Sequence, residues 1–414
     1  MENRCLSLFV ISLTFAVLAF PVQAGEKFWY PAEWEPHDSV WIGFRTFEDG
    51  PRYEPLLEEM VRVLAKHVPV KVVIEDEQLL PAGQAHFLKS GADPGRIEIF
   101  VEKFADFWFR DPGPLFLTSD RQGLAIANFS YSNYANVPPE LFTPDAIKYG
   151  NIDTDIAQRL GLPLVESNIV LEGGAFEVNG RGTVLLAAST LRRNPGLDRV
   201  EIESEVLRTL GQKKVIWLNE GLAEDPLGFS RISGKYWGRG AGGHTDEFVR
   251  FVNANTVLLA WVPEDARDEN PVYKINYHRM SENYELLRAA TDQDGNALTI
   301  IKVPVPSLIM ERYVIQSEEA GFFQKTDPEL LAGAEIYVVA AASYLNYVVS
   351  NGIVLLPQYA DAHSAGEQID KDAKVRGVIE KYFPERQIVP MNPSALNYHG
   401  GGMHCIVVQQ SSRK

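Results

Sequence analysis

Short apolar runs alternate with polar and turn-forming residues along most of the chain, a pattern that predicts β-strands. One arrangement recurs: a strand ends in small or polar residues, and a second apolar strand follows after a turn containing Gly or Asn. The copies begin at Phe104, Asn168, Gly242, Ala341 and Leu396. Asn179–Gly180 and Asn351–Gly352 are typical hairpin turns. The pattern therefore predicts about five hairpins in series.

Amphipathic helices are predicted between these hairpins. Residues 53–67 and 201–210 are two candidates, and the first has an apolar face made of Leu56, Leu57, Met60, Val61 and Leu64. Further strands are predicted at 70–74, 96–101, 215–218 and 298–303. The Pro- and Gly-rich stretch 221–243 is predicted to form long loops.

Repetition of a strand, helix and hairpin unit about five times predicts a closed radial array, since no single unit could bury its own apolar face. We expect one domain over residues 25–414. In such an array the same part of each unit faces the axis, so residues distant in sequence meet there. Comparable places in four of the copies are occupied by Asp111, Glu172, His244, Asp246 and Cys405.

The first 24 residues have a different pattern. Arg4 precedes an apolar run from Cys5 to Phe20, and the segment ends at Ala24. This predicts a secretory signal peptide cleaved after Ala24. An uncleaved anchor is the alternative, although the run is shorter than the roughly 20 residues that span a bilayer. We therefore expect an exported protein, periplasmic or secreted, with no membrane span after cleavage.

Composition narrows the class of protein. The chain is 45% hydrophobic and 23% charged, which is typical of globular proteins and excludes disordered, collagen-like and disulfide-scaffold classes. The net charge of −16 argues against a nucleic-acid partner and favours cationic small molecules. Composition is silent on the oligomeric state.

Signal cleavage would leave Cys405 as the sole cysteine, so it could form no internal disulfide. It could be an inert buried residue, an intermolecular bridge or a reactive nucleophile. The three glycines at 400–402 permit close approach of a ligand to the backbone, or simply form a tight turn. On a strand, the neighbouring His404 would face away from Cys405, which argues against His404 as its base.

His244 and Asp246 are two residues apart and would share a face if extended, which offers a proton-transfer group and an acceptor in one pocket. A structural hydrogen bond and a metal site are the other interpretations of this pair. No second His stands at a spacing typical of metal ligands.

Asp111 and Glu172 lie in apolar, turn-rich sequence, where a carboxylate is costly unless paired. Asp111 could instead cap a turn or pair with an Arg, and Glu172 could be a solvated strand end. Taken together, one thiol, one imidazole and three acids suit attack on a planar guanidinium. Carboxylates can hold such a cation, a thiolate can attack its carbon, and His can transfer protons to the amine and from water.

At residues 31–37 (PAEWEPH), 108–111 (WFRD), 171–174 (LEGG), 243–246 (GHTD) and 402–405 (GMHC), the sequence resembles the agmatine deiminase and bacterial peptidylarginine deiminase family of guanidine-modifying enzymes. These motifs span nearly the whole chain after the signal segment. The resemblance implies the pentein fold, a five-bladed α/β propeller built from pseudo-fivefold ββαβ repeats. It also implies that no metal or organic cofactor is needed.

The resemblance further implies roles for the site residues. Cys405 would be the nucleophile that forms a thiouronium intermediate, His244 the general acid and base, and Asp111 and Asp246 the guanidinium clamp. Glu172 would orient His244. Further candidates for substrate binding are Trp34, Trp108, Glu247 and Gly402. The reaction would convert a guanidino group to a ureido group with release of ammonia, and agmatine would give N-carbamoylputrescine.

Three departures from the family pattern affect the substrate. Pro112 replaces a frequent Ser or Thr, Gly402 replaces the Asn frequent in agmatine deiminases, and Glu247 adds an acid that would bind a distal ammonium or lie on a surface strand. The opening motif and length favour agmatine. The alternatives are deimination of arginine side chains in peptides, an amidinotransferase, a metallohydrolase, and an exported cation-binding protein without catalysis.

Overall fold

The computed structural model describes residues 26–44, 53–89, 91–103, 107–121, 123–135, 150–361, 364 and 366–413. The predicted signal peptide, its cleavage site and Cys5 lie outside the described residues. Within these ranges, no helix combines the length and the apolar character needed to cross a bilayer.

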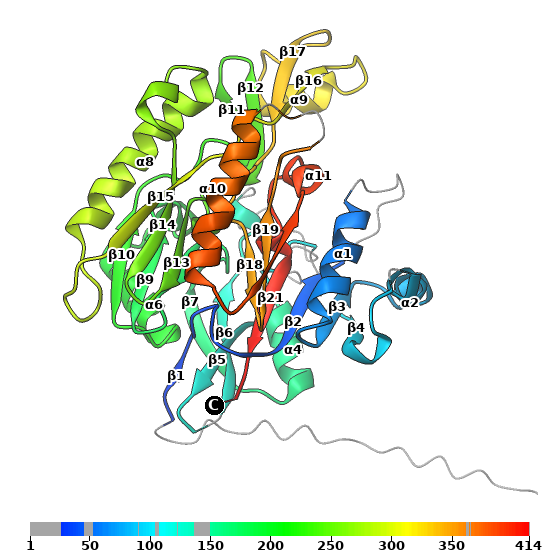
Figure 1. Ribbon diagram of the computed structural model, residues 1–414. Helices are drawn as coiled ribbons and strands as arrows, with labels where there is room; N and C mark the ends of the chain where they lie inside the picture. The colour runs from blue at the N-terminus through cyan, green and yellow to red at the C-terminus, as the bar shows by residue number, and fades with distance from the viewer. Residues whose placement is uncertain are drawn as a thin grey trace, which may run out of the picture.

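Five units of one design make up most of the described chain (Figure 1). Each unit has an antiparallel strand pair, then a helix, then a third strand that pairs in parallel with the second strand of the pair. In four of the five units the antiparallel pair is a hairpin. The first unit consists of β5 (Leu115–Ser119), β6 (Leu124–Ser130), α4 (Ile152–Leu160) and β7 (Leu164–Val170). The second consists of β8 (Phe176–Val178), β9 (Thr183–Ala187), α6 (Arg199–Thr209) and β10 (Lys214–Leu218). The third consists of β13 (Val249–Asn253), β14 (Thr256–Trp261), α8 (Pro271–Ala289) and β15 (Thr299–Pro304).

The remaining two units complete a ring. The fourth unit consists of β18 (Val348–Ser350), β19 (Ile353–Pro357), α10 (Gly366–Tyr382) and β20 (Gln387–Met391). The fifth consists of β21 (Val407–Ser411), β2 (His37–Gly43), α1 (Glu54–Leu64) and β3 (Val70–Ile74), with β4 (Ile97–Val101) at its edge. This arrangement confirms the predicted α/β fold, a five-bladed propeller of ββαβ units.

The last strand of the chain closes the ring by pairing with the first long strand. β21 lies antiparallel to β2, with Trp41 opposite Val408, and Figure 1 shows the red strand beside the blue one. The prediction of a consecutive hairpin beginning at Leu396 is therefore wrong. That segment holds α11 (Ser394–Asn397) and one strand, because its partner strand comes from the other end of the chain.

A further four-stranded sheet stands apart from the ring, at the top of Figure 1. It contains β11 (Leu227–Ser233), β12 (Tyr236–Ala241), β16 (Met310–Val314) and β17 (Glu335–Val339), with α9 (Ala320–Thr326) alongside. The prediction of loops over 221–243 is wrong here. β12 pairs in parallel with β17, about a hundred residues later, and these distant hydrogen bonds offset the low strand propensity of its glycines.

The predicted helices and isolated strands are confirmed to within a few residues. α1 begins with Pro in its first turn and buries Leu57, Met60, Val61 and Leu64 against β2 and β3, as its apolar periodicity requires. The other short elements are β1 (Phe28–Trp29), α2 (Leu80–Lys89), α5 (Ser189–Arg193) and α7 (Thr245–Phe248).

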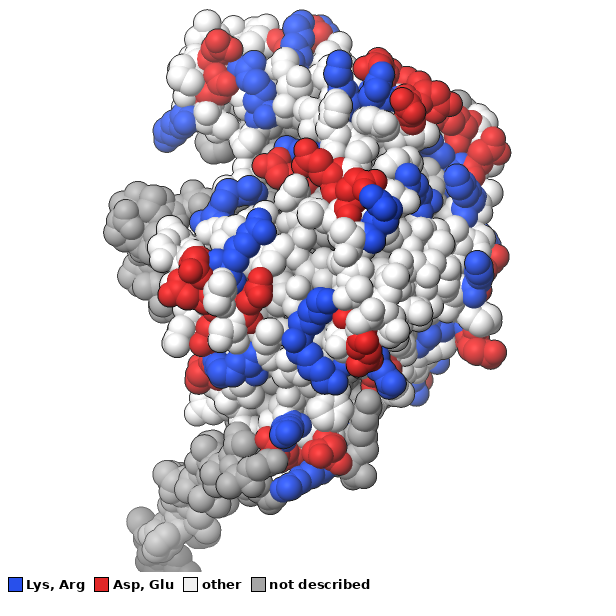
Figure 2. Space-filling model, turned by 90° about the vertical axis from the view of Figure 1, so that its left-hand side faces the viewer, with Lys and Arg blue, Asp and Glu red and all other residues white. Residues whose placement is uncertain are grey.

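Basic and acidic side chains are interspersed on the face shown in Figure 2. The net charge of −16 therefore does not produce a single acidic surface on that side of the molecule.

Candidate active site

Cys405 lies in a 3-10 helix, His404–Ile406, directly after the glycine turn, and its side chain is buried. The side-chain amide of Asn346 donates to Sγ at 3.2 Å, and the backbone N–H of Gly402 donates at 3.4 Å. Two carboxylate oxygens, one of Asp246 and one of Glu247, each lie 3.7 Å from Sγ. Burial raises the pKa of the thiol well above its usual value, and these carboxylates raise it further. Without a bound cation, Cys405 is therefore protonated at neutral pH.

Gly402 contributes its backbone rather than a side chain. A Cβ at this position would lie 2.2 Å from Oδ1 of Asn346, so no larger residue could fit without moving Asn346. Gly402 thus donates to Sγ through its N–H, and its close packing against Asn346 leaves no room for a side chain.

His244 and Asp246 are brought together by a short helix rather than by a strand. His244 precedes α7, and Asp246 lies in its first turn. Gly174, in the loop after β7, approaches both. A Cβ on Gly174 would lie 2.6 Å from Nδ1 of His244 and 3.1 Å from an oxygen of both Asp111 and Asp246. The three side chains therefore surround one point above the backbone of Gly174.

The imidazole of His244 is fully buried among charged groups. Its Nδ1 lies 3.6 Å from Asp111, and its Nε2 lies 3.3 Å from Arg193 and 3.8 Å from Glu172. Burial by itself lowers the pKa of His244, but the carboxylates of Asp111 and Glu172 outweigh it and raise the pKa to about 9. His244 is therefore an imidazolium at neutral pH and can donate a proton.

Glu172 is held by Arg193, with an Nε to Oε2 distance of 2.5 Å. Burial raises the pKa of Glu172, but Arg193 and His244 more than compensate and lower it to about 2. Glu172 is therefore a permanent anion behind the imidazole, which fits the orienting role that the family resemblance implies.

Asp111 accepts hydrogen bonds from the backbone N–H of Gly174 at 2.9 Å and from the hydroxyl of Tyr134 at 2.8 Å. Burial is the main reason that its pKa is raised to about 6, and the nearby acids Asp246 and Glu172 contribute. Tyr134 also lies against the ring of His244, with a centroid distance of 5.8 Å. It holds a positive φ of 60°, a conformation uncommon outside glycine that is often associated with functional sites.

His404 lies beneath the thiol and connects two acids. Its ring nitrogens are 2.7 Å from Asp246 and 2.6 Å from Glu33. The strand argument placed His404 on the opposite side from Cys405, whereas the 3-10 helix directs it to Asp246. His404 still makes no described contact with Sγ, so it orients Asp246.

Glu33 belongs to the opening motif and anchors a buried charge network. Its carboxylate pairs with Arg250 at 2.5 Å and with Arg110 at 3.1 Å. Arg250 also binds Glu177 at 3.1 Å. Removing one partner of such a buried pair costs about 3–5 kcal/mol, because the other charge is left uncompensated. The network therefore fixes the floor beneath Asp246 and His404.

A cavity of about 200 Å³ opens onto the thiol. Its wall includes Trp108, Asp111, Tyr134, Arg239 and Cys405. Its size, below the ~300–1,000 Å³ of pockets for drug-sized ligands, suits one guanidino side chain. His244 and Asp246 do not line the cavity itself but lie directly behind two residues that do, His244 at 3.6 Å from Asp111 and Asp246 at 3.7 Å from Sγ of Cys405.

Two of the predicted binding residues, Trp34 and Glu247, have surroundings that differ from those expected. Trp34 packs against the hydrophobic core between the third and fourth units and does not line this cavity. Glu247 is buried beside Sγ, where Asn346 donates to it at 2.9 Å. It is therefore neither a surface residue nor placed to meet the far end of a substrate. Its carboxyl group contacts Asn346 and the thiol of Cys405.

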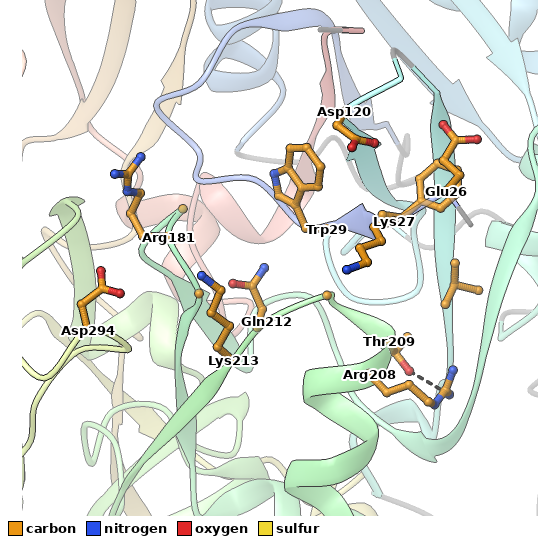
Figure 3. Close-up of a pocket in the computed structure, with 15 residues that line it drawn as sticks. Glu26, Lys27, Trp29, Asp120, Arg181, Arg208, Thr209, Gln212, Lys213 and Asp294 are labelled. Atoms are coloured by element: carbon orange, nitrogen blue, oxygen red, sulfur yellow. Dashed lines mark hydrogen bonds between the residues drawn. The ribbon is translucent and has the colours of Figure 1, made fainter. Parts of the chain in front are cut away.

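A second cavity of about 870 Å³ is larger but holds neither the thiol nor an imidazole (Figure 3). It lies between the segment around β1 and the turns at 180–182 and 211–213. The chemistry of the site residues, rather than cavity size, therefore locates the candidate active site around Cys405.

Among the described residues, Asp246, Glu247 and Cys405 form one group whose ligand atoms lie within 4.8 Å of one another. Oδ2 of Asp246 already contacts His404, and burial with the charges of Asp246 and Asp225 raises the pKa of Glu247 well above its usual value. Asn346 also donates to Glu247 at 2.9 Å, so two of the three residues already have partners within the protein.

Sequence reasoning missed several residues that shape the site: Asn346, Tyr134, Asp225, Arg193 and Glu33. Glu33 had a signal, since it stands in the PAEWEPH motif. No sequence motif marked Asn346 or Tyr134, because only the fold brings them close to Cys405 and Asp111.

The five-bladed ring, with a thiol, an imidazole and carboxylates converging in one cavity, defines a pentein of the guanidine-modifying class. The chain belongs to the Porphyromonas-type peptidyl-arginine deiminase family, which it matches over residues 29–411. This is the family that the motifs predicted.

Named relatives extend over almost the same length. Agmatine deiminase of Pseudomonas aeruginosa is 28% identical over 403 residues, covering 93% of this chain and 96% of that protein. Agmatine deiminase of Medicago truncatula is 29% identical over 398 residues, covering 92% and 96%. The structure of agmatine deiminase of Enterococcus faecalis aligns with a TM-score of 0.73 at 24% identity, covering 94% and 97%. The chain is thus a hydrolase of the class that acts on C–N bonds of linear amidines.

Proposed function

We propose that the protein hydrolyses the guanidino group of agmatine, giving N-carbamoylputrescine and ammonia through a covalent intermediate on Cys405. The names and full-length coverage of the curated relatives support agmatine as the substrate. The convergence of His244, Asp111 and Asp246 above Gly174, beside the thiol, carries the proposal.

Two acceptor groups at this point are suited to a cation. Oδ1 of Asp246 is buried without a hydrogen-bond partner in the described part of the chain, and Asp111 faces the same space. A guanidinium bound between these carboxylates would satisfy them through charge-assisted hydrogen bonds that fix its plane. Its central carbon would then lie next to Sγ.

Binding of the cation also activates the nucleophile. The carboxylates hold the thiol protonated in the free enzyme, and a positive guanidinium offsets their charge, so that the proton of Sγ leaves to solvent. The thiolate attacks the guanidinium carbon and gives a neutral tetrahedral adduct. The imidazolium of His244 protonates one nitrogen, ammonia leaves, and a thiouronium cation remains on Cys405.

Water completes the cycle. Neutral His244 takes a proton from water, and the resulting hydroxide adds to the thiouronium carbon. The C–S bond then breaks, the ureido product forms, and the hydroxyl proton released in this collapse restores the thiol. The net reaction consumes one guanidinium and one water and yields one ureido group and one ammonium.

The rival substrate is the arginine side chain of a peptide, which would become citrulline, and the family description supports it. An amidinotransferase would instead transfer the carbon to a second amine. A cation-binding protein would bind the guanidine without turnover.

We also propose that the protein is exported, either to the periplasm or out of the cell, and that its first 24 residues are removed. The apolar run from Cys5 to Phe20 supports this. If agmatine is the substrate, the product belongs to putrescine formation. N-terminal sequencing of protein recovered from periplasm and medium tests export, since retention of Met1 in a cytosolic fraction would contradict it.

A Cys405→Ser variant tests the chemistry. We expect ammonia release from agmatine to be lost, while agmatine binding measured by calorimetry is retained. Wild-type protein quenched during turnover should carry an added amidine mass on the peptide containing Cys405. Undiminished ammonia release by the variant would refute the thiol mechanism, and an unchanged mass with active enzyme would refute the covalent intermediate.

A further inference from the structure

Glu247 contacts the thiol but takes no part in the proposed steps of hydrolysis. Its Oε1 lies 3.7 Å from Sγ of Cys405, and the side-chain amide of Asn346 donates to both atoms, at 2.9 Å to Oε1 and at 3.2 Å to Sγ. The amide is held in this orientation because its Oδ1 accepts the backbone N–H of His404 at 2.8 Å. One amide group therefore keeps the carboxyl group and the thiol together.

The surroundings of Glu247 favour a proton on its carboxyl group. Burial and the charges of Asp246 and Asp225 raise its pKa well above the usual value, whereas the contact with Cys405 lowers it. The titratable groups that act on Glu247, or on which it acts, are Asp246, Asp225, Glu224, Cys405 and Tyr359. A carboxylate with a raised pKa binds a proton more tightly than an ordinary acid does, so transfer of a proton from Sγ to Oε1 is less costly.

Two other groups near the thiol are less suited to accept this proton. Asp246 also lies 3.7 Å from Sγ, but its Oδ2 is bound to His404 at 2.7 Å. Burial raises the pKa of Asp246, and the hydrogen bond and charge of His404 outweigh this and lower it. His244 is an imidazolium at neutral pH, and none of its contacts with described residues is with Sγ.

We propose that Glu247 is the base that takes the proton of the Cys405 thiol. This role rests on the proposed deiminase chemistry. Binding of the guanidinium beside these acids drives the proton of Oε1 to solvent, which leaves a carboxylate next to the thiol. As Sγ attacks, the S–H bond breaks and its proton passes to Oε1, while Asn346 donates to the developing thiolate. One proton leaves to solvent for each guanidinium bound, as when the thiol loses its proton directly, so the balance of the later steps is unchanged.

Alkylation by chloroacetamidine isolates this step. The reagent carries a planar amidinium cation, and its reaction with Cys405 forms a C–S bond and releases chloride. The reaction requires removal of the Sγ proton but neither a proton from His244 nor water. Glu247→Gln keeps an acceptor for Asn346 but cannot take a proton. At pH 7 we expect intact-mass measurements to show alkylation about 100-fold slower than in the wild type.

Glu224→Gln is the matched control. It makes the same change in a buried acid that accepts hydrogen bonds from Asn276 rather than from Asn346 and the thiol. It should keep the wild-type rate of alkylation. Glu247→Asp, which keeps a carboxylate one methylene farther back, should fall between Glu247→Gln and the wild type, and it replaces Glu247→Gln if that variant does not fold. A wild-type rate in either variant of Glu247 would overturn the proposal.

The pH dependence separates a base from a residue that only positions the thiol. In Glu247→Gln the thiol must lose its proton to solvent, so the alkylation rate should rise about tenfold per pH unit and approach the wild-type rate in alkaline buffer. A displaced thiol would react slowly at every pH, and that result would also overturn the role of Glu247 as the base.

Failure of this role and failure of the deiminase proposal can be told apart. If agmatine is turned over through an adduct on Cys405 and Glu247→Gln is alkylated as fast as the wild type, Glu247 is not the base and the deiminase proposal stands. If no guanidino compound is turned over but alkylation of Cys405 slows in Glu247→Gln and recovers at high pH, Glu247 activates the thiol and the proposed catalysis is overturned.

Discussion

The carboxylate of Asp225 lies directly behind the backbone of His244 and accepts its N–H at 2.8 Å. The same carboxylate accepts the preceding three backbone N–H groups, those of residues 241–243. One buried side chain therefore fixes the whole connection from β12 to the imidazole. Burial raises the pKa of Asp225, and the four donors oppose this by favouring the charged form.

Asp225→Asn should lower kcat by about 10- to 100-fold, because misplacement of His244 by a fraction of an ångström impairs proton transfer. In this variant an NH₂ group replaces one carboxylate oxygen of residue 225, so a donor would face backbone N–H groups that need an acceptor. KM should change little, since Asp225 does not line the cavity. Steady-state kinetics and a thermal melt measure both effects. Asp327→Asn, which alters an exposed ion pair, is the control, and an unaltered kcat in folded Asp225→Asn protein would contradict the positioning role.

The dependence of kcat/KM on pH should be bell-shaped. Asp111 must be ionised to hold a cation, so activity falls as pH drops through about 6, the raised pKa of that carboxyl. His244 must be protonated to donate to the leaving nitrogen, so activity falls as pH rises through about 9. Tyr134→Phe removes a hydrogen bond to ionised Asp111 and should move the acid limb to higher pH. An acid limb that stays in place would show that another group controls it.

Alkylation of the thiol should abolish activity, whereas chelation of metal ions should leave it unchanged. Iodoacetamide should abolish ammonia release and label Cys405, more slowly at low pH because the pKa of the buried thiol is raised. Excess substrate should protect it. Dialysis against EDTA should leave activity unchanged, because the proposed steps use only side chains and water. Loss of activity on chelation, with recovery on adding a divalent metal, would instead favour the metallohydrolase interpretation.

We expect ionisation of Asp153 to lower the free energy of unfolding as the pH rises. This buried residue of α4 has a pKa raised to about 8, chiefly by burial, against about 3.9 in an unfolded chain. The folded state therefore binds more protons than the unfolded state across this window, and its free energy of unfolding falls as pH increases from about 4 to 8. Asp153→Asn keeps the acceptor for the N–H of Thr154 and should stabilise the protein at pH 7 by about 1–2 kcal/mol.

Urea unfolding midpoints at pH 5 and pH 8 measure this effect. Asp155→Asn, an exposed change in the same helix, is the control and should shift neither midpoint. A wild-type midpoint that rises from pH 5 to pH 8 by more than that of Asp153→Asn would show that Asp153 is ionised in the folded state.

The sequence by itself determined the repeated unit and the chemistry-bearing residues. Leu57, Met60, Val61 and Leu64 predicted α1 because helix periodicity is a local property, and the apolar strands β3 and β10 were predicted for the same reason. Two local features also identified residues of the site. One is the lone thiol of Cys405 after three glycines, and the other is the spacing of His244 and Asp246. The argument for His244 and Asp246 assumed an extended strand, whereas a turn of helix places them.

Tertiary structure decided how these residues are held and what else surrounds them. The pairing of β2 with β21, and of β12 with β17, joins segments that share no local signal, so the closing blade and the additional sheet were not predictable from periodicity. Arg239 and Tyr134 line the cavity and Asn346 contacts the thiol, although all three lie far from Cys405 in the sequence. Trp34 was predicted to bind substrate from its motif and instead packs in the core. Side-chain periodicity depends on neighbours in sequence, whereas a binding site depends on which distant surfaces the folded chain brings into contact.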